Sequence, residues 1–474
     1  MYLGGASVFQ STNPATGEVV ATFEETPADQ VDLALNDAVA AQRLYAKTSP
    51  EERANLLRRI AGVLRSRRDE LAALVTLEMG KPIAEAEGEI EKCALGCDFY
   101  ADNAASFLEP EDVQTNASES YVVLDPLGVV LAIMPWNFPF WQFFRFAAPS
   151  LAAGNGIVLK HAANVPQCAA AIADVLKQAN APQGLCHVLF IPSGAVAALI
   201  RDPRIAALTL TGSTEVGAIV AAQAGQALKK QVLELGGSDP FIVLADADVE
   251  AAAAMAVKAR FTNTGQSCVC AKRFIVEDAV AEAFVEAFAK HMSRLVMGAP
   301  TDRSTQVGPM ARDNLRSDLL SQVERSVAAG AVLRAGGQAA DGPGFFFEPT
   351  LLDHVTPDMA AFSEETFGPV AAIIRARDAE HALELANASE FGLGAALWTQ
   401  DLGLARKLAR QIEAGAVFIN GMVASDPRLP FGGVKRSGYG RELGIHGLRE
   451  FTNVKTIWIG PAVAPAPAPL AVNE

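Results

Sequence analysis

The sequence predicts an α/β protein with two α/β domains, each built on a parallel sheet that helices cover on both faces. From Tyr121 onward, short apolar segments that end in turn residues alternate with Ala-rich helical stretches. This alternation is typical of parallel sheets with both faces buried. The pattern continues through the second half of the chain. With 474 residues, half of them hydrophobic, the chain has enough apolar material for large cores.

The N-terminal part contains a well-marked helical pattern. Ser49 can cap a helix, Pro50 suits its first position and Glu51 favours the positive end of the helix dipole. Leucine, isoleucine and valine residues then recur at helical spacing as far as Val75. Gly80 marks the end of this pattern. We therefore expect one long helix beginning near Ser49.

Later elements follow from short apolar runs and the stretches between them. Ala395–Thr399, the helix after it and Ala416–Asn420 form a plausible βαβ unit. A Gly-rich surface connection is expected over Gly336–Phe347, and a loose Pro/Ala-rich tail over Gly460–Glu474. The predicted strands are Val129–Met134, Gly156–Lys160, Ala207–Thr211, Phe241–Leu244, Arg273–Val276, Val370–Ile374, Ala395–Thr399 and Ala416–Asn420, with helices at Gln167–Gln178, Val249–Phe261, Val280–Leu295, Asp378–Asn387 and Asp401–Ile412.

Composition excludes several classes of function. A net charge of −15 would repel phosphate backbones, so nucleic acid is not expected as a partner. Met1–Gln10 lacks the pattern of a signal peptide, and prolines and polar residues interrupt the longest apolar stretch, Val129–Leu159, so no membrane span is expected. Six scattered cysteines indicate a reducing, cytoplasmic setting. Six scattered histidines offer no paired metal-ligand spacing, so we expect no metal site.

Three local sequences could carry chemistry. Asn137 lies between Pro135 and Pro139, so a stiff turn holds its amide, as an oxyanion site requires. Glu234 lies in an apolar run before two glycines, where burial would raise its pKa and make it a usable base. Cys268 follows Thr264-Gly265-Gln266-Ser267 and could act as a thiolate nucleophile. The alternatives are a rigid loop, a solvent-facing strand-end glutamate and a buried structural cysteine.

A possible phosphate-binding turn lies at Leu210–Gly217. The segment resembles a strand running into a helix, where free backbone N–H groups and the helix dipole favour a pyrophosphate. The chain contains no G-x-G-x-x-G motif, and any strand-to-helix turn could have this appearance.

Taken together, these stretches resemble the NAD(P)-dependent aldehyde dehydrogenase superfamily over nearly the whole chain. Glu234 and Cys268 have the spacing of that family, and the matching stretches follow its order. They are PWNFP (135–139), Lys160, TGSTEVG (211–217), LELGG (233–237), GQSC (265–268), EETFGPV (364–370) and PFGGVKRSGYGRE (430–442).

The resemblance implies a role for each catalytic residue. Cys268 would attack the aldehyde carbon to give a thiohemiacetal, and Asn137 with the Cys268 backbone N–H would stabilise the oxyanion. After hydride transfer to NAD or NADP, Glu234 would activate the water that hydrolyses the thioester. The resemblance also implies eight cofactor-binding residues: Lys160 and Glu365 at the ribose, Trp136 and Ser213 near the ribose and phosphates, Phe367 at the nicotinamide end, and Gly212, Val216 and Leu235.

The same resemblance implies an aldehyde dehydrogenase-like fold and a homodimer or homotetramer. It has a Rossmann-like cofactor domain, an α/β catalytic domain and a small β oligomerisation arm. The cofactor domain would comprise 1–117 and 135–233, the catalytic domain 234–445, the arm 118–134 and 446–460, and the loose tail 461–474.

Within the superfamily the sequence is most similar to the succinate-semialdehyde dehydrogenases. Arg145 and Ser425 fall where such enzymes bind the distal carboxylate of the substrate, although Arg145 could instead form a structural ion pair. Thr262 replaces a second arginine found in some of these enzymes, and Arg260 does not match it. Glutarate semialdehyde and aliphatic or aromatic aldehydes therefore stay open as substrates.

Two further positions bear on the cofactor and on regulation. Ala163 replaces a glutamate that binds the adenosine ribose in strictly NAD-using relatives, so NADP is possible as well as NAD. Cys270 could form a reversible disulfide with Cys268 or could simply pack. A non-catalytic protein on this fold would be expected to lack Cys268, Glu234 or Asn137. A thiol hydrolase would give the cofactor positions no role.

Overall fold

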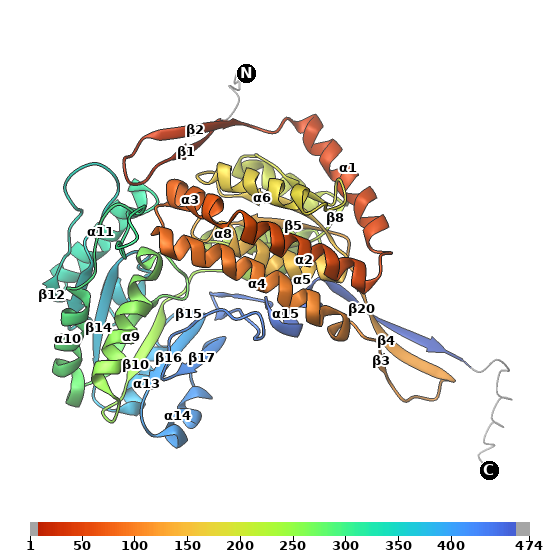
Figure 1. The fold of residues 1–474 in the computed structure, drawn as a ribbon. Helices are drawn as coiled ribbons and strands as arrows, with labels where there is room; N and C mark the ends of the chain where they lie inside the picture. Colours follow the sequence, from red (N-terminus) through yellow and green to blue (C-terminus); the bar gives the residue numbers. More distant parts are fainter. Residues whose placement is uncertain (1–7, 461–474) are drawn as a thin grey trace, which may run out of the picture.

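A computed structural model describes residues 8–460, and Figure 1 shows two α/β bodies with an arm that extends from one of them. The first body contains a six-stranded sheet in the order β19-β9-β8-β5-β6-β7, parallel except for β19. Its strands are β5 (Val129–Met134), β6 (Gly156–His161), β7 (Cys186–Val188), β8 (Ile205–Thr211), β9 (Lys230–Glu234) and β19 (Gly438–Tyr439).

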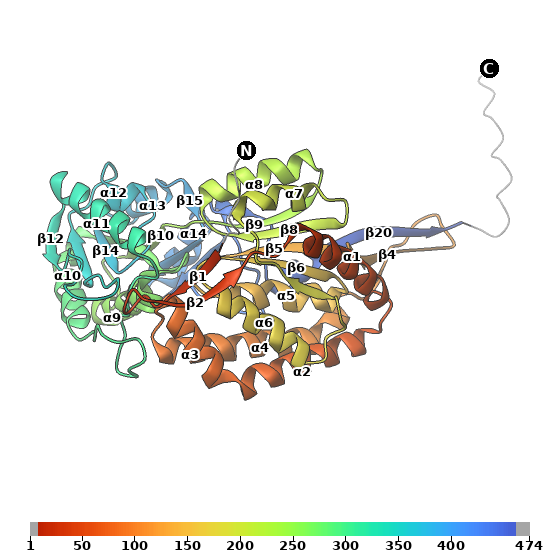
Figure 2. The ribbon, with the colours of Figure 1, turned by 90° about the horizontal axis from the view of Figure 1, so that it is seen from above.

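Helices cover both faces of this sheet because alternate residues of β5 point to opposite sides. Val130 and Ala132 pack in one apolar cluster with α2 to α6, and Val129 and Leu131 pack in another with α1, α7 and α8. Figure 2 shows α7 and α8 on one side of the sheet and α4, α5 and α6 on the other. These helices are α1 (Ala28–Tyr45), α2 (Pro50–Ser66), α3 (Arg68–Met79), α4 (Ile83–Phe107), α5 (Trp141–Ala153), α6 (Pro166–Gln178), α7 (Val196–Arg201) and α8 (Thr214–Gln226).

The second body contains a seven-stranded sheet in the order β12-β13-β14-β11-β10-β16-β17, parallel except for the edge strand β12. Helices α9 and α10 cover one face, and α11 to α14 cover the other. The elements are β10 (Asp239–Val243), α9 (Val249–Phe261), β11 (Ala271–Glu277), α10 (Asp278–Met292), α11 (Asp313–Ala328), β12 (Val332–Ala335), β13 (Thr350–Asp353), α12 (Ala360–Ser363), β14 (Val370–Ala376), α13 (Ala379–Asn387), β16 (Gly394–Trp398), α14 (Leu402–Ala409) and β17 (Ala416–Ile419).

A three-stranded antiparallel sheet, β20-β4-β3, forms the arm that projects from the first body (Figures 1 and 2). The remaining elements are short, and they include two two-stranded antiparallel sheets, β1-β2 and β15-β18. The arm strands are β3 (Glu111–Asp112), β4 (Glu119–Pro126) and β20 (Thr452–Ile459); the others are β1 (Val8–Thr12), β2 (Val19–Glu24), β15 (Phe391–Gly392), β18 (Val434–Lys435), α15 (Gly444–Glu450) and the 3₁₀ turns η1 (Ser193–Ala195) and η2 (Thr262–Gly265).

The domain boundaries expected from the sequence are wrong at the arm. The range 118–134 includes β5, which is buried throughout and is a central strand of the first sheet. The range 446–460 begins inside α15, which packs on α5 and α4 of the first body. β19 lies within 234–445, yet it pairs with β9 of the first sheet. Short terminal segments return to the first body because their apolar residues complete its core.

Apart from the helix expected from Ser49, the predicted elements are confirmed in type, most of them with shifted ends. The βαβ unit of β16, α14 and β17 is present, although α14 ends at Ala409. The long helix expected from Ser49 is wrong: it breaks at Arg67, whose backbone is non-helical, into α2 and α3. Ser49 does cap α2, accepting a hydrogen bond from the Glu52 backbone N–H. The predicted connection over 336–347 is irregular, and residues 461–474 lie outside the described part.

No helix within residues 8–460 has both the length and the apolar character needed to cross a bilayer. The six cysteines, all of them in this part of the chain, are free thiols.

Candidate active site

Three cavities adjoin one another where the two bodies meet. The first cavity, of about 880 Å³, and the second, of about 260 Å³, share Trp136, Ser213 and Arg312 in their walls. The second cavity and the third, of about 180 Å³, share Cys268. The thiol of Cys268 therefore lies where two cavities with different linings meet.

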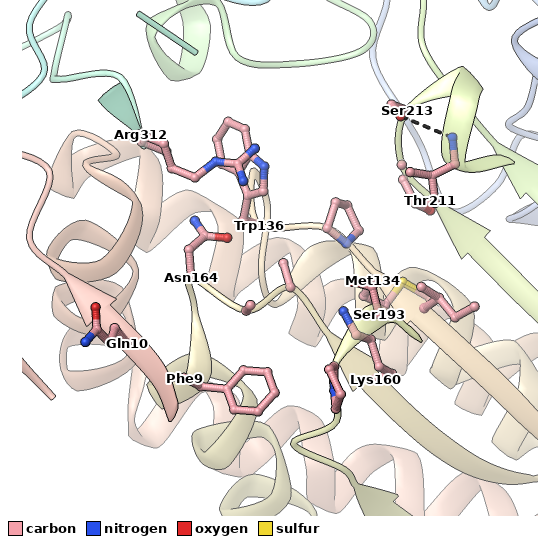
Figure 3. A pocket seen from close by; sticks show the side chains of 18 of the residues that line it. Phe9, Gln10, Met134, Trp136, Lys160, Asn164, Ser193, Thr211, Ser213 and Arg312 are labelled. Carbon is pink, nitrogen blue, oxygen red and sulfur yellow. Dashed lines mark hydrogen bonds between the residues drawn. The ribbon is translucent and has the colours of Figure 1, made fainter. Parts of the chain in front are cut away.

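The first cavity has the features of a site for an anionic dinucleotide (Figure 3). Lys160 lies in it at the end of β6, and burial lowers the pKa of its ammonium group. The N-terminus of α8 opens into it, with Ser213 as its cap. Asn164 also lines it, and its buried Nδ2 has no hydrogen-bond partner within residues 8–460. A cation, free helix N–H groups and an unpartnered amide fit phosphate and ribose groups.

The predicted cofactor positions all line these two cavities. Trp136, Gly212 and Ser213 contribute to both. Lys160 and Val216 contribute to the first, and the second contains the other three, Leu235, Glu365 and Phe367.

The Gly236-Gly237 pair lets Glu365 reach the second cavity. A Cβ on Gly236 would lie 2.5 Å from Oε2 of Glu365, so any larger residue there would displace the carboxylate. Oε1 of Glu365 accepts a hydrogen bond from the Gly237 N–H at 3.0 Å and lies 3.4 Å from the ammonium group of Lys272. The LELGG sequence thus fixes the position of a carboxylate 128 residues further along the chain.

An aromatic and cationic stack forms the wall between the first and second cavities. The rings of Trp136 and Phe367 meet edge to face, with centroids 5.7 Å apart. The guanidinium of Arg312 lies 5.7 Å from the Trp136 ring. Figure 3 shows the two side chains next to each other. Such a wall can contact planar rings of a ligand by stacking and cation–π interactions.

The loop before Cys268 has a strained backbone. Asn263 and Thr264 have φ values of 55°, and Gly265 has a φ of 71°. A Cβ on Gly265 would lie 2.3 Å from the Gly368 carbonyl oxygen, so only glycine fits there. Non-glycine residues in this region cost of order 1–3 kcal/mol each and persist when neighbouring contacts enforce them.

Buried polar groups enforce this conformation. The Asn263 side chain donates to the carbonyl oxygens of Asn137 and Gln266, at 2.9 and 3.0 Å. The carboxylate of Glu85 accepts the Asn263 backbone N–H at 2.6 Å. The buried guanidinium of Arg260 donates to the Gly265 carbonyl oxygen at 2.6 Å. Arg260 therefore holds the loop rather than a substrate.

Asn137 lies beside this loop. Its side chain is buried and lines the second cavity together with Cys268. Its Nδ2 donates to the Gln266 carbonyl oxygen at 3.2 Å, which uses one of its two N–H groups. The second N–H is available to a ligand in the second cavity.

The surroundings of Cys268 favour the neutral thiol over the thiolate. Burial raises its pKa to about 12, while the positive charges of Arg145 and Lys272 lower it and the carboxylates of Glu365 and Glu234 raise it. A further positive charge beside the sulfur would favour the thiolate.

Glu234 lies at the end of β9, fully buried, and both of its carboxylate oxygens lack hydrogen-bond partners within residues 8–460. Burial raises its pKa well above the usual range; Glu442 raises it further, and Arg145 and Arg441 lower it. A Cβ on Gly432 would lie 2.7 Å from its Oε1, which places the carboxyl beside that backbone. Glu234 does not line any of the three cavities in this conformation.

The third cavity contains both residues expected to bind a substrate carboxylate. Arg145 and Ser425 line it, as does Thr262. The guanidinium of Arg145 forms a buried ion pair with Glu442 and lies 4.6 Å from the Phe431 ring. The alternative of an ion pair for Arg145 thus holds, although the side chain still faces the cavity.

Sequence reasoning missed Lys92, Asn164, Asn263 and Arg312, each of which lines a cavity or holds the Cys268 loop. Asn263 had a signal, since it directly precedes the Thr264-Gly265 stretch. The others carry no local pattern, because contacts distant in sequence bring them to the site.

Cys270 is buried, its thiol donates to the Thr262 carbonyl oxygen at 3.4 Å, and burial raises its pKa. Its disulfide with Cys268 stays a prediction.

Comparisons with known proteins agree with this geometry. The model of the aldehyde dehydrogenase family matches residues 3–457. The chain is 52% identical over 454 residues to succinate-semialdehyde dehydrogenase (NADP+) 1 of Mycobacterium ulcerans, covering 95% of this chain and 99% of that protein. It is 52% identical over 447 residues to a probable succinate-semialdehyde dehydrogenase (NADP+) of Synechocystis sp., covering 94% and 98%.

A crystal structure of succinic semialdehyde dehydrogenase from Streptococcus pyogenes in complex with NADP+ superposes with a TM-score of 0.93 at 38% identity, covering 96% of this chain and all of that one. Family match, sequence identity and backbone similarity extend over both bodies and the arm. The chain belongs to the aldehyde dehydrogenase family.

Proposed function

We propose that this enzyme oxidises succinate semialdehyde to succinate, with NADP+ or NAD+ as the oxidant. The observation that carries the proposal is the position of Cys268. It lies where the second cavity, which adjoins the cavity suited to a dinucleotide, meets the third cavity, lined by Arg145, Lys92 and Ser425. The names of the similar proteins from Mycobacterium ulcerans and Streptococcus pyogenes support the choice of substrate and of NADP+.

In the proposed reaction, the Cys268 sulfur attacks the aldehyde carbon and forms a thiohemiacetal. The free N–H of Asn137 and the backbone N–H of Cys268 stabilise the charge on oxygen. Because the Asn263 and Gln266 contacts already fix Asn137, its amide needs no rearrangement as the charge develops.

The cofactor would be held by residues of the first two cavities. Lys160 and the α8 N-terminus at Ser213, which line the first cavity, would hold the phosphates and one ribose, and Glu365, which lines the second, would hold the other ribose. The chemistry that a nicotinamide dinucleotide supplies when bound is acceptance of a hydride from the thiohemiacetal carbon, which leaves a thioester on Cys268.

Glu234 then acts as the base that removes a proton from the hydrolytic water. Its buried carboxyl has a raised pKa, which suits a general base acting near neutral pH. Since it does not line the second cavity here, the side chain must turn about its own rotatable bonds toward Cys268. Its oxygens accept no hydrogen bonds within residues 8–460, so no such bond opposes this turn.

Steady-state kinetics on matched aldehydes test the proposal. We expect succinate semialdehyde to give the highest kcat/KM in a panel that includes glutarate semialdehyde, butanal and benzaldehyde, with each nicotinamide dinucleotide in turn. An uncharged aldehyde with equal or higher kcat/KM would contradict the substrate assignment while leaving the aldehyde dehydrogenase activity in place.

Replacement of Ala163 by glutamate should shift cofactor preference toward NAD+. Ala163 lines the first cavity beside Asn164 and near Lys160, so a carboxylate there would repel a 2′-phosphate and accept hydrogen bonds from a free ribose hydroxyl. We expect the ratio of kcat/KM for NADP+ to that for NAD+ to fall at least about tenfold, equivalent to about 1.4 kcal/mol.

Ala163→Gln is the matched control, since it adds similar bulk without the charge. It should change the ratio much less than Ala163→Glu. Equal ratios in the wild type and the glutamate variant would show that Ala163 does not face the 2′ position.

We also propose that the enzyme assembles as a homodimer or homotetramer through the arm. Val454, Trp458 and Ile459 of β20 are 43–67% exposed, and β20 is an edge strand of the arm sheet. Exposed apolar residues on an edge strand favour pairing with another chain. Light scattering should give a multiple of the 49.9 kDa chain mass; a monomer at micromolar concentration would contradict the assembly.

A further inference from the structure

The side chains that line the third cavity carry positive charge without matching negative charge. Two cations line it, Arg145 and Lys92, and none of the acidic side chains in residues 8–460 does. Arg145 is paired with Glu442. Lys92 forms no ion pair with any residue in the range 8–460, although it is half-buried in α4.

Lys92 is instead held in a small polar network. Its Nζ donates to the Ser425 Oγ at 2.7 Å and lies 4.6 Å from the Trp141 ring. The Trp141 indole N–H donates to the same Oγ at 3.2 Å. Ser425 therefore accepts two hydrogen bonds and keeps its own hydroxyl proton, while the ammonium group keeps two further N–H donors.

This arrangement is incomplete without an anion. Burial and the positive charge of Arg145 together lower the pKa of Lys92 to about 8, against the opposing effects of Cys93, Glu89 and Asp426. An ammonium group removed from water is stabilised by a carboxylate that accepts its hydrogen bonds. Lys92 and Ser425 line the same small cavity and together keep three donors, enough for the two oxygens of a carboxylate.

We propose that Lys92 binds the distal carboxylate of the substrate together with Ser425 and thereby determines specificity for a semialdehyde that carries an acid group. This inference rests on the proposed oxidation of succinate semialdehyde. Arg145 has a lesser part in it, because the carboxylate of Glu442 already balances its charge. The aldehyde end of the substrate then reaches Cys268, which lines the same cavity.

Substrates that differ only in the distal group test the proposal. Butanal replaces the carboxylate of succinate semialdehyde by a methyl group of similar size. For Lys92→Met we expect kcat/KM for succinate semialdehyde to fall about 10- to 150-fold, mainly through KM, as the loss of charged hydrogen bonds predicts. The value for butanal should stay within about threefold of wild type, because its chain makes no polar contact with Lys92.

Two variants serve as controls. Lys47→Met removes an exposed lysine after α1 and should leave kcat/KM unchanged for both succinate semialdehyde and butanal. Lys92→Arg keeps the positive charge and should retain most of the preference for succinate semialdehyde over butanal.

A second assay measures binding without turnover. Succinate should protect the Cys268 thiol from alkylation by iodoacetamide in the wild type, and this protection should be lost in Lys92→Met.

The outcomes separate this inference from the proposed function. If wild type prefers succinate semialdehyde and Lys92→Met keeps that preference, the Lys92 assignment is overturned and the proposed function stands. If wild type does not prefer succinate semialdehyde over butanal, both are overturned. Should Lys92→Met fold poorly, Lys92→Gln also removes the charge, and its kinetics and its loss of succinate protection decide the question in the same way.

Discussion

Replacement of Cys268 by alanine should abolish aldehyde oxidation and leave dinucleotide binding unchanged. The thiol lies where the second and third cavities meet, and no other cysteine lines the second cavity. Without the sulfur no thiohemiacetal forms, so we expect turnover to fall roughly 10⁴-fold or more. Lys160 and the α8 N-terminus are untouched, so quenching of protein fluorescence by NADP+ should give the wild-type Kd.

Cys97→Ala is the matched control for this variant. Cys97 is a fully buried thiol of α4 that lines none of the three cavities, so its removal should cost some stability but little activity. Turnover of Cys268→Ala at more than a few per cent of the wild-type rate would contradict the nucleophile assignment. Loss of NADP+ binding would mean instead that the substitution disturbs the whole site.

The fold was largely predictable because its strands are continuous buried runs. β5 and β6 are buried at every position, and such runs bounded by turn residues have few other interpretations. The break at Arg67 was not predictable, since the apolar spacing continues across it. The assignment of β5 to the first body rather than to the arm was not predictable either, because it depends on the pairing of β5 with β6 and β8.

The candidate site was predictable where its residues lie in unusual local sequences and not where distant contacts create it. Pro135–Pro139 and the segment before Cys268 carry their own constraints in the form of prolines and a glycine at positive φ. Lys92 is different. Its proposed role in carboxylate binding depends on the hydrogen bond with Ser425, 333 residues away, and on the ion pair that neutralises Arg145. A lysine within a helix gives no sign of such a partner.

Replacement of Glu234 by glutamine should separate the two halves of the reaction. Glutamine keeps the shape of the side chain but cannot accept a proton from water, so thioester formation continues while hydrolysis slows. We expect steady-state kcat to fall about 10²- to 10⁴-fold, the usual contribution of a general base. Rapid mixing should then show a burst of reduced nicotinamide close to one per active site, followed by the slow phase.

Glu324→Gln, on the exposed side of α11, is the control and should show no change in the steady-state rate.

The pH dependence of the hydrolysis rate provides a second measurement. Because burial and Glu442 raise the pKa of Glu234, its basic form is absent at low pH and accumulates only as the pH rises through that raised value. The wild-type hydrolysis rate should therefore rise with pH, and this titration step should be missing in Glu234→Gln. A variant that hydrolyses the thioester at the wild-type rate, without a burst, would transfer the role of base to another group.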